Sequence, residues 1–556
     1  MKNDTSDETA NIYEQGLPKT AANHVALSPV SFVERSAEVF GDLPAIVHGN
    51  RRYTWRELRD RSARLAAALR ALGIGRGDTV SVMLPNTPEM VEAHYAVPAL
   101  NAVLNTLNTR LDASLLAWQM NHCEAKVLIT DREFAPTMAP ALRLLRDTHG
   151  RVPIVIDVFD SEYTGAGERL GTHEYEAWLS EHAPLARLGG PQDEWDAIAV
   201  SYTSGTTGDP KGVVTHHRGA YLNAVCNAAT WTMPHFPTYL WTLPMFHCNG
   251  WCFPWTVAML GGTHVCLRRV DAPNILAAMR DHGVDHYCAA PIVHNLLIAA
   301  PADLRAGITR KVRGMVAGAA PPASMIEGMA RLGFDITHVY GLTETAPFIT
   351  VCEMRPEHDR LSPADRAVLK ARQGVELVTS GELLVVDEHD HEVPHDGVTV
   401  GEIVVRGNVV MKGYYEDPEA SAVALRGGYF HSGDAAVVHP DGYAEIRDRL
   451  KDVIISGGEN ISSVEVEGVL LQHEVVQEVA VVGMPHEKWG ESPNAFVVLR
   501  AGQTTTDVAL RAFVRERLAH FKCPQAFHFV TELPKTATGK VQKFILRGRK
   551  AGISTQ

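Results

Sequence analysis

Hydrophobic and polar positions follow two alternating periods along the first part of the chain, one typical of helices and one typical of buried strands. Residues 55–72 carry apolar side chains at helical spacing, and Gly73 ends this segment. Residues 79–84 form an apolar run that predicts a buried strand, residues 88–104 predict a second helix, and residues 125–130 predict a second strand. This alternation predicts a largely parallel sheet covered by helices.

The same alternation returns in the middle of the chain and then gives way to a different pattern. Residues 263–267 predict another strand, and a helix is expected after Asp271, so that two similar α/β halves are expected. Beyond Gly374, short strands separated by turn residues predict a small β-rich lobe. The expected strands of this lobe span residues 381–386, 398–406 and 443–447.

The last hundred or so residues have the pattern of a separate small α+β domain. Helices are expected over residues 464–471 and 506–518, and strands over residues 476–482 and 495–499. We therefore expect a large α/β N-terminal domain, with two α/β halves and the β-rich lobe, followed by a smaller α+β C-terminal domain. The predicted division is a disordered extension over residues 1–20, the N-terminal domain over 21–450 and the C-terminal domain over 451–556.

Composition and charge narrow the partners and the compartment. The 556 residues carry a net charge of −13, which argues against nucleic acid or an anionic membrane as the main partner. No run of eighteen apolar residues occurs, so no membrane span is expected. The eight cysteines are scattered, as in a protein with reduced thiols. Because the first twenty residues lack a signal-peptide pattern and residues 553–556 are not a peroxisomal address, a cytoplasmic location is expected.

The segment 203–212, TSGTTGDPKG, concentrates hydroxyl groups, glycines and a lysine between two short apolar runs. Glycines allow backbone N–H groups to approach a ligand closely, hydroxyls donate to phosphate oxygens, and Lys211 supplies a positive charge. A flexible turn is the alternative interpretation, but the density of hydroxyls favours a loop that binds phosphate. The segment is not a P-loop, because Pro210 stands where that motif needs its second glycine.

Five further segments carry groups suited to a nucleotide. Small residues at 318–322 offer a flat surface for an aromatic base, and residues 340–345 combine a tyrosine, a tight turn, hydroxyls and a carboxylate. Residues 429–434 offer a carboxylate for ribose hydroxyls, residues 448–452 cluster charges near the expected domain boundary, and residues 534–540 carry two lysines. Each segment alone is explained as well by a turn, a helix cap or a solvated charge cluster. Their occurrence together in this order favours a nucleotide site.

A match to the zinc-protease pattern H-E-x-x-H occurs at residues 391–395. That pattern binds zinc only on a helix, where both histidines share a face. Because Pro394 lies inside the match and Asp396 and Gly397 follow it, a hairpin turn is expected and a zinc site is rejected.

The segments 203–212, 340–345 and 534–540 are together highly specific, and through them the chain resembles the acyl-adenylate-forming superfamily over residues 32–549. This superfamily includes acyl-CoA synthetases, firefly luciferases and peptide-synthetase adenylation domains. The resemblance implies an ATP-dependent acid–thiol ligase: a carboxylic acid and ATP give acyl-AMP and pyrophosphate, and the acyl group then passes to the CoA thiol with release of AMP. It implies ATP, Mg²⁺ and CoA as the molecules bound, and a homodimer is one expected assembly.

The resemblance also implies a role for each residue of the nucleotide site. Lys540 would bridge the acid, the α-phosphate and the ribose, with Lys211 on the leaving phosphates. Thr203 and Glu344 would hold Mg²⁺, which prefers oxygen ligands, and His247 would close over the acid. The other expected nucleotide contacts are Ser204, Gly205, Thr206, Thr207 and Gly208 in the phosphate loop; Gly318, Ala319, Ala320 and Tyr340 at adenine; Gly341, Thr343 and Thr345 near the α-phosphate; and Asp434, Ile446 and Arg449 near the ribose.

The second half-reaction is expected to use the C-terminal domain. In the family this domain rotates about a hinge, expected here at Lys451, to present a channel for the pantetheine thiol. Residues 456–462 match the segment that lines the channel, so Gly458→Leu is expected to lose thioester formation and to keep acyl-AMP formation. Contacts to CoA are expected from Gly457, Gly458, Glu459 and Trp489.

The acid is expected to occupy a pocket shaped by residues 244–253. Residues 235–269 contain no aspartate for a substrate ammonium group, so an α-amino acid is not expected. Aromatic side chains and thiols favour an apolar acid, and the segment looks most like those of medium-chain, aryl and methylthiopropionate CoA ligases. Trp251 either limits chain length or belongs to the core, and Cys248 and Cys252 are expected to pack rather than bind a metal. The expected pocket residues are His247, Cys248, Trp251, Cys252, Val316 and Gly341.

Two alternative functions stay open at this point. One is an enzyme that loads the acyl group onto a carrier-protein phosphopantetheine instead of CoA. The other is a non-catalytic protein that binds an acyl group or a nucleotide. The second alternative is disfavoured because the chain retains every charged residue that the chemistry needs, namely Lys211, Glu344, Asp434, Arg449 and Lys540.

Overall fold

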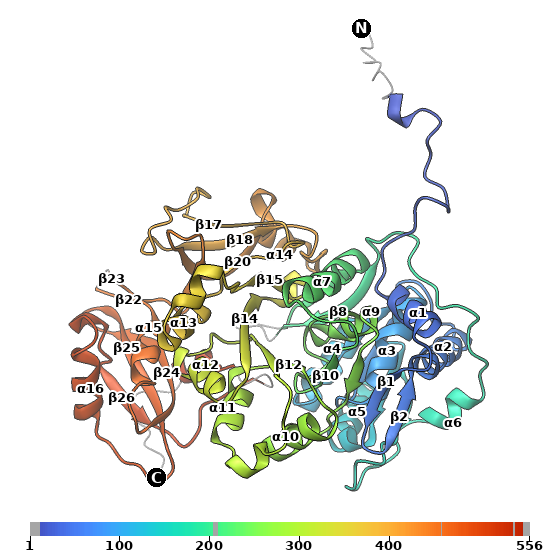
Figure 1. The fold of residues 1–556 in the computed structure, drawn as a ribbon, viewed down its shortest axis with the longest axis horizontal. Coiled ribbons are helices and arrows are strands. Elements are labelled where there is room, and N and C mark those ends of the chain that lie inside the picture. Colours follow the sequence, from blue (N-terminus) through green and yellow to red (C-terminus); the bar gives the residue numbers. More distant parts are fainter. Residues whose placement is uncertain (1–11, 204–209, 458, 537–539, 549–556) are drawn as a thin grey trace.

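The computed structural model describes residues 12–203, 210–457, 459–536 and 540–548. In Figure 1 the large N-terminal domain, coloured blue to orange, fills most of the view, and the C-terminal elements, coloured red, lie against one side of it. Residues 12–29, which precede α1 (Val30–Val39), extend away from the body of the domain.

The first half of the N-terminal domain is built on an eight-stranded sheet in the order β19-β9-β8-β4-β3-β5-β6-β7. The strands from β8 to β7 in this order are parallel, whereas β9 and β19 are antiparallel to their neighbours. Every residue of β3 is buried, as is typical of a parallel strand covered on both faces. The strand bounds are β3 Thr79–Met83, β4 Val103–Thr106, β5 Val127–Asp131, β6 Ile154–Val158, β7 His173–Glu174, β8 Ala197–Tyr202, β9 Gly212–His216 and β19 Gly413–Tyr414.

The second half is built on a nine-stranded sheet in the order β16-β15-β14-β13-β12-β10-β11-β1-β2. The strands from β14 to β1 are parallel, and β2, β15 and β16 are antiparallel to their neighbours. The prediction of two α/β halves is confirmed, although β1 and β2 from the start of the chain join the second sheet. The strand bounds are β1 Pro44–His48, β2 Arg51–Thr54, β10 Thr238–Leu240, β11 Thr263–Val265, β12 His286–Ala289, β13 Arg313–Val316, β14 Asp335–Gly341, β15 Phe348–Val351 and β16 Val375–Glu376.

Helices cover both sheets and begin where the sequence supplies caps. At the start of α2 the Thr54 hydroxyl accepts from the Glu57 N–H, and the Glu57 carboxylate accepts from the Thr54 N–H at 2.7 Å, which forms a capping box. The helix bounds are α2 Trp55–Ala71, α3 Pro88–Ala99, α4 Ala113–His122, α5 Ala135–His149, α6 Tyr175–Ser180, α7 His217–Thr230, α8 Cys248–Trp251, α9 Phe253–Met259, α10 Ala272–Asp281, α11 Pro291–Ala299, α12 Ala323–Arg331, α13 Pro363–Lys370 and α14 Pro418–Ala424.

The predicted single helix over residues 88–104 is wrong in its second part. Helix α3 ends at Ala99, Asn101 adopts a left-handed φ of 55°, and strand β4 begins at Val103. Because asparagine tolerates the left-handed region better than most residues, it makes the sharp turn that redirects the chain into the sheet.

The β-rich lobe is a four-stranded antiparallel sheet in the order β17-β18-β20-β21. Its H-E-x-x-H match lies in a hairpin, where the Asp387 N–H donates to the His391 carbonyl at 2.8 Å and His395 lies 3.0 Å from Glu392. The described residues contain no group of three or more His, Cys, Asp or Glu that could hold a metal. The prediction of a turn is therefore confirmed. The strand bounds are β17 Glu382–Val386, β18 Gly401–Arg406, β20 Phe430–Val438 and β21 Ala444–Arg449.

The C-terminal domain has its own sheet, with the path β23-β22-β25-β24 and β26 paired to β25, and its own buried core around Val466 and Val481. The predicted helices and strands of this domain are all present, within a few residues of their expected bounds. The division of domains at residue 450 stays a prediction. The bounds are β22 Ile454–Ser456, β23 Glu459–Ile461, β24 Val476–His486, β25 Gly490–Leu499, β26 Ala526–Phe529, α15 Ser463–Leu470, α16 Asp507–Arg515 and α17 Lys543–Arg547.

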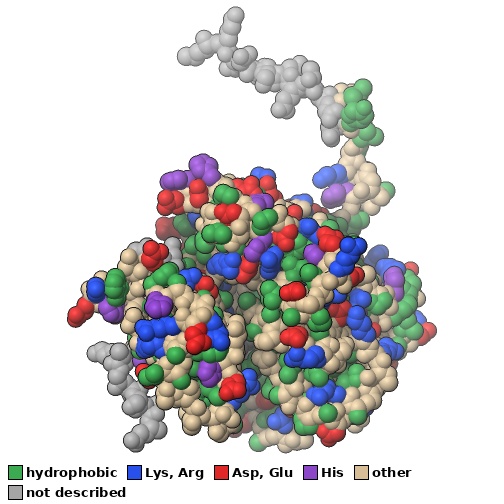
Figure 2. Space-filling view, turned by 60° about the vertical axis from the view of Figure 1, so that its left-hand side comes forward, with side chains coloured by type: hydrophobic (Ala, Val, Ile, Leu, Met, Phe, Trp, Pro, Cys, Tyr) green, Lys and Arg blue, Asp and Glu red, His purple; other side chains and the backbone are tan. Residues whose placement is uncertain are grey.

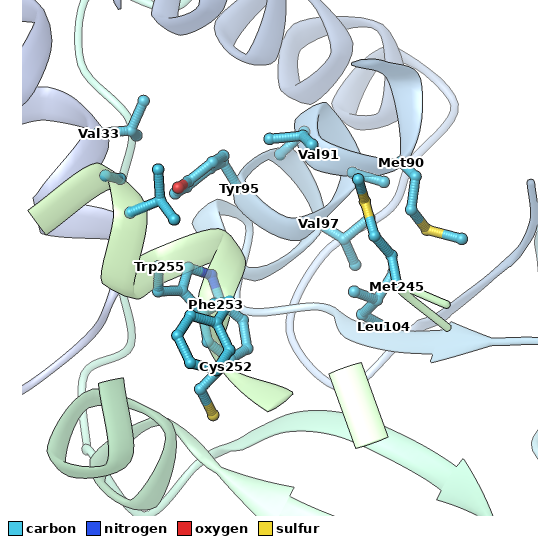
Figure 3. Close-up of a cluster of buried hydrophobic side chains, with 14 of the residues drawn as sticks. Val33, Met90, Val91, Tyr95, Val97, Leu104, Met245, Cys252, Phe253 and Trp255 are labelled. Carbon is cyan, nitrogen blue, oxygen red and sulfur yellow. The ribbon is translucent and has the colours of Figure 1, made fainter. Parts of the chain in front are cut away.

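A buried cluster joins the two halves of the N-terminal domain beneath the site. Figure 3 shows Tyr95 of α3 above Trp255 and Phe253 of α9, with Met90 of the same helix beside Met245. The Tyr95 hydroxyl donates to the Pro254 carbonyl at 2.5 Å, and the Trp255 indole N–H donates to the His94 carbonyl at 3.2 Å. These paired polar groups fix Trp255 in a single place, which matters because Trp255 also lines the cavity described below.

The surface carries mixed charge. On the face drawn in Figure 2, Lys and Arg side chains are interspersed with Asp and Glu side chains over both domains. Among the helices of the described ranges, none has both the length and the apolar character needed to cross a bilayer.

Candidate active site

The phosphate loop connects β8 to β9, and its ends are held together. The Thr203 N–H donates to the Lys211 carbonyl at 3.0 Å, which continues the antiparallel pairing of the two strands. The Lys211 ammonium lies 4.6 Å from the centre of the Tyr414 ring. The predicted phosphate contacts in the middle of the loop, Ser204, Gly205, Thr206, Thr207 and Gly208, lie outside the described residues.

Glu344 and Lys211 meet at Tyr414, a residue that the motif analysis missed. The Tyr414 hydroxyl donates to Glu344 Oε1 at 3.0 Å, and β19 carries Tyr414 alongside β9 in register with Val213. Burial raises the pKa of Glu344 above its usual value, and the Tyr414 hydrogen bond opposes that shift. A lone tyrosine has no distinctive spacing, so only the pairing of β19 with β9 reveals it.

Asp434 and Arg449 face each other on neighbouring strands of the lobe. They are register partners in β20 and β21, and Arg449 Nε lies 2.8 Å from Asp434 Oδ1. The Tyr340 hydroxyl donates to Asp434 Oδ2 at 2.6 Å, so an aromatic ring stands next to this carboxylate. Ile446 is half-buried and packs against the same core cluster as Tyr340. The structure thus brings together the residues predicted for the ribose and adenine.

The small residues predicted to contact adenine follow the carboxyl end of β13. Gly318, Ala319 and Ala320 are exposed, and Gly318 has a φ of +84° with open space where a side chain would stand. An exposed, small-residue surface of this kind suits a flat aromatic base. Val316, predicted as a pocket residue, is instead fully buried in the core behind β13.

The predicted residues at the end of β14 and just after it differ in their contact with solvent. Thr345 is fully buried: its hydroxyl donates to the Pro347 carbonyl at 2.8 Å and accepts from the Leu342 N–H at 2.9 Å, so it closes the turn in place of the expected phosphate contact. A side chain at Gly341 would lie 1.7 Å from the Pro347 oxygen, so only glycine fits there. Thr343 keeps solvent contact.

Lys540 of the C-terminal domain lies at the N-terminal domain's site. It keeps contact with solvent, but burial, and next Arg449, lower the pKa of its ammonium to about 8, while Asp434 opposes that shift. Burial and the charge of Lys540 also lower the pKa of His247 to about 4, so His247 is neutral near pH 7. The domains are therefore arranged with the C-terminal lysine beside the predicted ribose and acid residues.

The predicted hinge is braced by polar contacts on both sides. The Asp448 carboxylate accepts from the Ser463 N–H and from the Ser463 hydroxyl, both at 2.6 Å, and Arg547 Nη2 lies 2.6 Å from Asp452. Burial lowers the pKa of Lys451 below its usual value. Asp448 lies near the end of the lobe, and Ser463 begins α15 of the C-terminal domain. The two bonds between Asp448 and Ser463 therefore connect the domains across Lys451.

The residues predicted to contact CoA lie at the ends of strands in the C-terminal sheet: Gly457 follows β22, Glu459 begins β23 and Trp489 precedes β25. The Gly457 N–H donates to the Trp489 carbonyl at 2.8 Å, and a side chain at Gly457 would approach the Trp489 ring to 2.7 Å. Trp489 and Glu459 are exposed. Gly458 lies outside the described residues.

A small cavity lies between the phosphate-loop strands and α9. Its volume is about 10 Å³, roughly the room for one water molecule. Of the predicted pocket residues, Cys248 and Cys252 line it, whereas Trp251 packs its ring on Phe348, with centroids 4.9 Å apart. Burial raises the pKa of Cys248 to about 12, so that thiol stays protonated. The lining is Ser201, Thr215, Ala220, Cys248, Asn249, Cys252, Trp255, Thr343 and Ala346.

The amino-acid sequence matches two family profiles and several known enzymes. The profile of the AMP-binding enzyme family matches residues 33–415, and that of the AMP-binding enzyme C-terminal domain matches residues 465–540. An acetate/butyrate–CoA ligase of Arabidopsis thaliana is 48% identical over 96% of each chain, and a benzoate–CoA ligase of the same plant is 43% identical over 96% of this chain and 94% of its own.

Solved structures agree with the sequence comparisons. The anthranilate–CoA ligase AuaEII in complex with anthranoyl-AMP has a TM-score of 0.81 at 25% identity, covering 95% of this chain and 98% of its own. The o-succinylbenzoate–CoA synthetase of Bacillus subtilis, in complex with its acyl-adenylate intermediate, has a TM-score of 0.78 at 27% identity, covering 94% and 99%. The predicted fold class, a large α/β domain followed by a smaller C-terminal domain, is confirmed.

The expectation of a cytoplasmic location is contradicted by the relatives. The acetate/butyrate–CoA ligase and the benzoate–CoA ligase of Arabidopsis thaliana are both named as peroxisomal. The expectation depended in part on reduced cysteines, and all eight are free in the structure. Free thiols do not distinguish one reducing compartment from another.

Proposed function

The chain belongs to the AMP-binding enzyme family, and we propose that it is an ATP-dependent acyl-CoA ligase that acts on short carboxylic acids. The observation that carries the proposal is the contact of Asp434 with Arg449 at 2.8 Å and with the Tyr340 hydroxyl at 2.6 Å, and the charge of Lys540 from the C-terminal domain acts on the same group. A binding protein would have no need to bring a partly desolvated lysine to a nucleotide site. The relatives named as CoA ligases for acetate, butyrate and benzoate support the reaction class.

In the first half-reaction, a carboxylate oxygen of the acid attacks the α-phosphorus of ATP. The new O–P bond forms as the bond to the β-phosphate oxygen breaks, and pyrophosphate leaves. Two anions must approach each other, so the ammonium groups of Lys540 and Lys211 offset their repulsion and hold them in line. Asp434 and Arg449 fix the ribose end of the nucleotide, with Tyr340 and residues 318–320 at the base. Thr343, which keeps solvent contact, replaces Thr345 as the hydroxyl near the α-phosphate.

The residues present fit a magnesium ion that is bound mainly by phosphates. Glu344 offers one carboxylate beside Tyr414, and the described residues contain no group of three or more His, Cys, Asp or Glu that could hold a metal. Mg²⁺ typically takes one or two carboxylates and completes its shell with waters and substrate phosphates. When bound, the ion would neutralise charge on the phosphates, with Glu344 and Thr203 as the protein ligands.

In the second half-reaction, the sulfur of CoA attacks the carbonyl carbon of acyl-AMP. The C–S bond forms, the bond to the AMP oxygen breaks, and the thiol proton passes to solvent. We propose that the hinge at Lys451 reorients the C-terminal domain between the two steps and brings Gly457, Glu459 and Trp489 to the site. For that rotation the bonds of Asp448 to Ser463 must break. The channel role predicted for Gly458, which lies outside the described residues, is part of this proposal.

The size of the cavity supports short acids over the medium-chain acids expected from the motif. A space of about 10 Å³ holds about one water molecule, whereas each added methylene needs further room. Trp255 forms one wall and is held by its hydrogen bond to His94, so the wall resists displacement. Longer chains therefore need more rearrangement of this wall than short ones, and the relative named for acetate and butyrate supports acids of two to four carbons. Loading of a carrier protein stays as the alternative acceptor, because both acceptors present the same pantetheine thiol.

Pyrophosphate release across a panel of acids, with and without CoA, tests the proposal. Acetate, propanoate and butanoate are expected to give the highest kcat/KM, with octanoate well below them. Turnover should require CoA and yield a thioester in equal amount to AMP. Turnover without CoA, or a preference for octanoate, would contradict the proposal.

A further inference from the structure

Part of the wall of the small cavity, called the acyl cavity below, is a left-handed turn. Five consecutive residues have a positive φ, at 39°, 46°, 55°, 54° and 63° for Cys248, Asn249, Gly250, Trp251 and Cys252. Four of the five are not glycine, and side chains make this conformation unfavourable. Backbone strain of this kind persists where the surroundings over-determine the conformation, and it is concentrated at functional sites.

Contacts from two other segments, the loop after β14 and helix α7, hold the turn. The Cys252 thiol donates to the Ala346 carbonyl at 3.3 Å, and the Cys248 thiol lies 3.3 Å from the Thr343 hydroxyl. The amide of Asn227 donates to the Trp251 carbonyl at 2.9 Å. The core and the loop after β14 thus hold this left-handed turn in place. Because Asn249 is part of the turn, its position is fixed as well.

Asn249 is 6% exposed, and its amide is only half satisfied. Its Oδ1 accepts from the Ser201 hydroxyl at 3.0 Å, whereas its Nδ2 is buried and has no hydrogen-bond partner among the described residues. Both Asn249 and Ser201 line the acyl cavity. An unpaired buried donor is costly, so a native structure rarely keeps one without a ligand or a water to bond it.

The other polar groups of the cavity are already paired. The Thr215 hydroxyl donates to the Ala199 carbonyl at 3.4 Å, and the Thr343 hydroxyl is with Cys248. Within the described ranges, Asn249 Nδ2 is therefore the donor of this cavity that lacks a partner. A purely apolar acyl chain would leave it unpaired.

We propose that Asn249 is a specificity-determining residue that donates a hydrogen bond to an acceptor oxygen in the acyl chain. The preferred substrates are then short acids with an ether or keto oxygen near the third position, ahead of the plain alkyl acid of the same size. Ser201 is a positioning residue, because its hydroxyl holds Oδ1 and directs Nδ2 into the cavity. This inference rests on the proposed function, since it assigns part of the same acyl site.

The test uses two acids of equal heavy-atom count, methoxyacetate and butanoate, with the full-length protein, ATP, Mg²⁺ and CoA. The measured quantity is the ratio of kcat/KM for methoxyacetate to kcat/KM for butanoate. Asn249→Gly removes the amide and relieves the left-handed backbone, and Asn249→Asp keeps the size and the backbone tolerance but removes the donor. Each variant is expected to lower the ratio about 5-fold, the usual net worth of one hydrogen bond between uncharged groups.

Thr215→Val is the matched control, because it alters the cavity wall without touching the amide, and it should leave the ratio unchanged. Ser201→Ala should lower the ratio less than the Asn249 variants do. The inference would be overturned if both Asn249 variants left the ratio unchanged. It would also be overturned if the wild type preferred acids whose chain carries a hydroxyl donor over acids whose chain carries an ether oxygen. Failure of the proposed function is distinct, because the wild type would then make no butanoyl-CoA at all.

Discussion

Replacing Lys540 by alanine is expected to slow acyl-AMP formation about 100-fold while ATP binding changes little. Lys540 approaches the site from the C-terminal domain, where it interacts with Arg449 and Asp434. The groups expected to bind the nucleotide otherwise belong to the N-terminal domain and are unaffected by the substitution. The loss should therefore fall on the transition state, in which the acid and the phosphate approach each other.

The magnitude follows from charge, distance and solvent contact. At about 4 Å a unit charge pair is worth about 4 kcal/mol at an effective dielectric constant of 20 and about 1 kcal/mol in water. Lys540 keeps solvent contact, yet its surroundings lower its pKa to about 8, so we take an intermediate value of about 2.7 kcal/mol. Each 1.36 kcal/mol changes the rate tenfold, which gives about 100-fold.

The assay traps acyl-AMP with hydroxylamine, using butanoate, ATP and Mg²⁺ without CoA, and calorimetric titration measures ATP affinity. Lys535→Ala is the matched control: Lys535 lies in the same segment but pairs with Glu478 at 2.6 Å, within the C-terminal domain. It should retain nearly full activity. Unchanged acyl-AMP formation in Lys540→Ala, or a loss of ATP affinity as large as the loss of rate, would refute the reasoning.

Further predictions concern the pH profile, the metal, the thiol step and the pocket. A lysine with a lowered pKa of about 8 loses its charge as the pH rises through that value, so adenylation should decline above pH 8 in the wild type and at higher pH in Lys540→Arg. Glu344→Gln should raise the Mg²⁺ concentration for half-maximal pyrophosphate release about 10-fold. Gly457→Val should lose thioester formation but keep acyl-AMP formation, because its side chain would strike Trp489. Trp255→Ala should shift the kcat/KM optimum toward hexanoate and lower Tm by several degrees, since it removes a buried indole.

The architecture could be predicted because each half repeats a simple local rule. A buried parallel strand reads as an apolar run, and a covering helix reads as an amphipathic one, so both sheets are visible in the sequence. The membership of β1 and β2 in the second sheet could not be predicted. Strand pairing across two hundred residues, such as Val47 with Val265, leaves no local pattern. The turn at Asn101 could not be predicted, because an apolar helix and an apolar strand adjoin there and give one continuous apolar pattern.

The proximity of the charged residues Asp434 and Arg449 could be predicted, and the shape of the acyl cavity could not. Asp434 and Arg449 lie in motifs whose order along the chain is itself informative. Tyr414 and Asn249 are single residues whose importance comes from what folds against them. Thr345 shows the converse: its motif position suggests a ligand contact, but the loop uses its hydroxyl to close a turn.

The central claim is that one chain makes acyl-AMP and then converts it to a CoA thioester. A single-turnover experiment with labelled butanoate and ATP tests it most directly, with CoA added after the adenylate has formed. We predict that butanoyl-AMP accumulates without CoA and that the label passes to butanoyl-CoA as AMP is released. A thioester that forms without prior adenylate, or an adenylate that persists unchanged in the presence of CoA, would contradict the account.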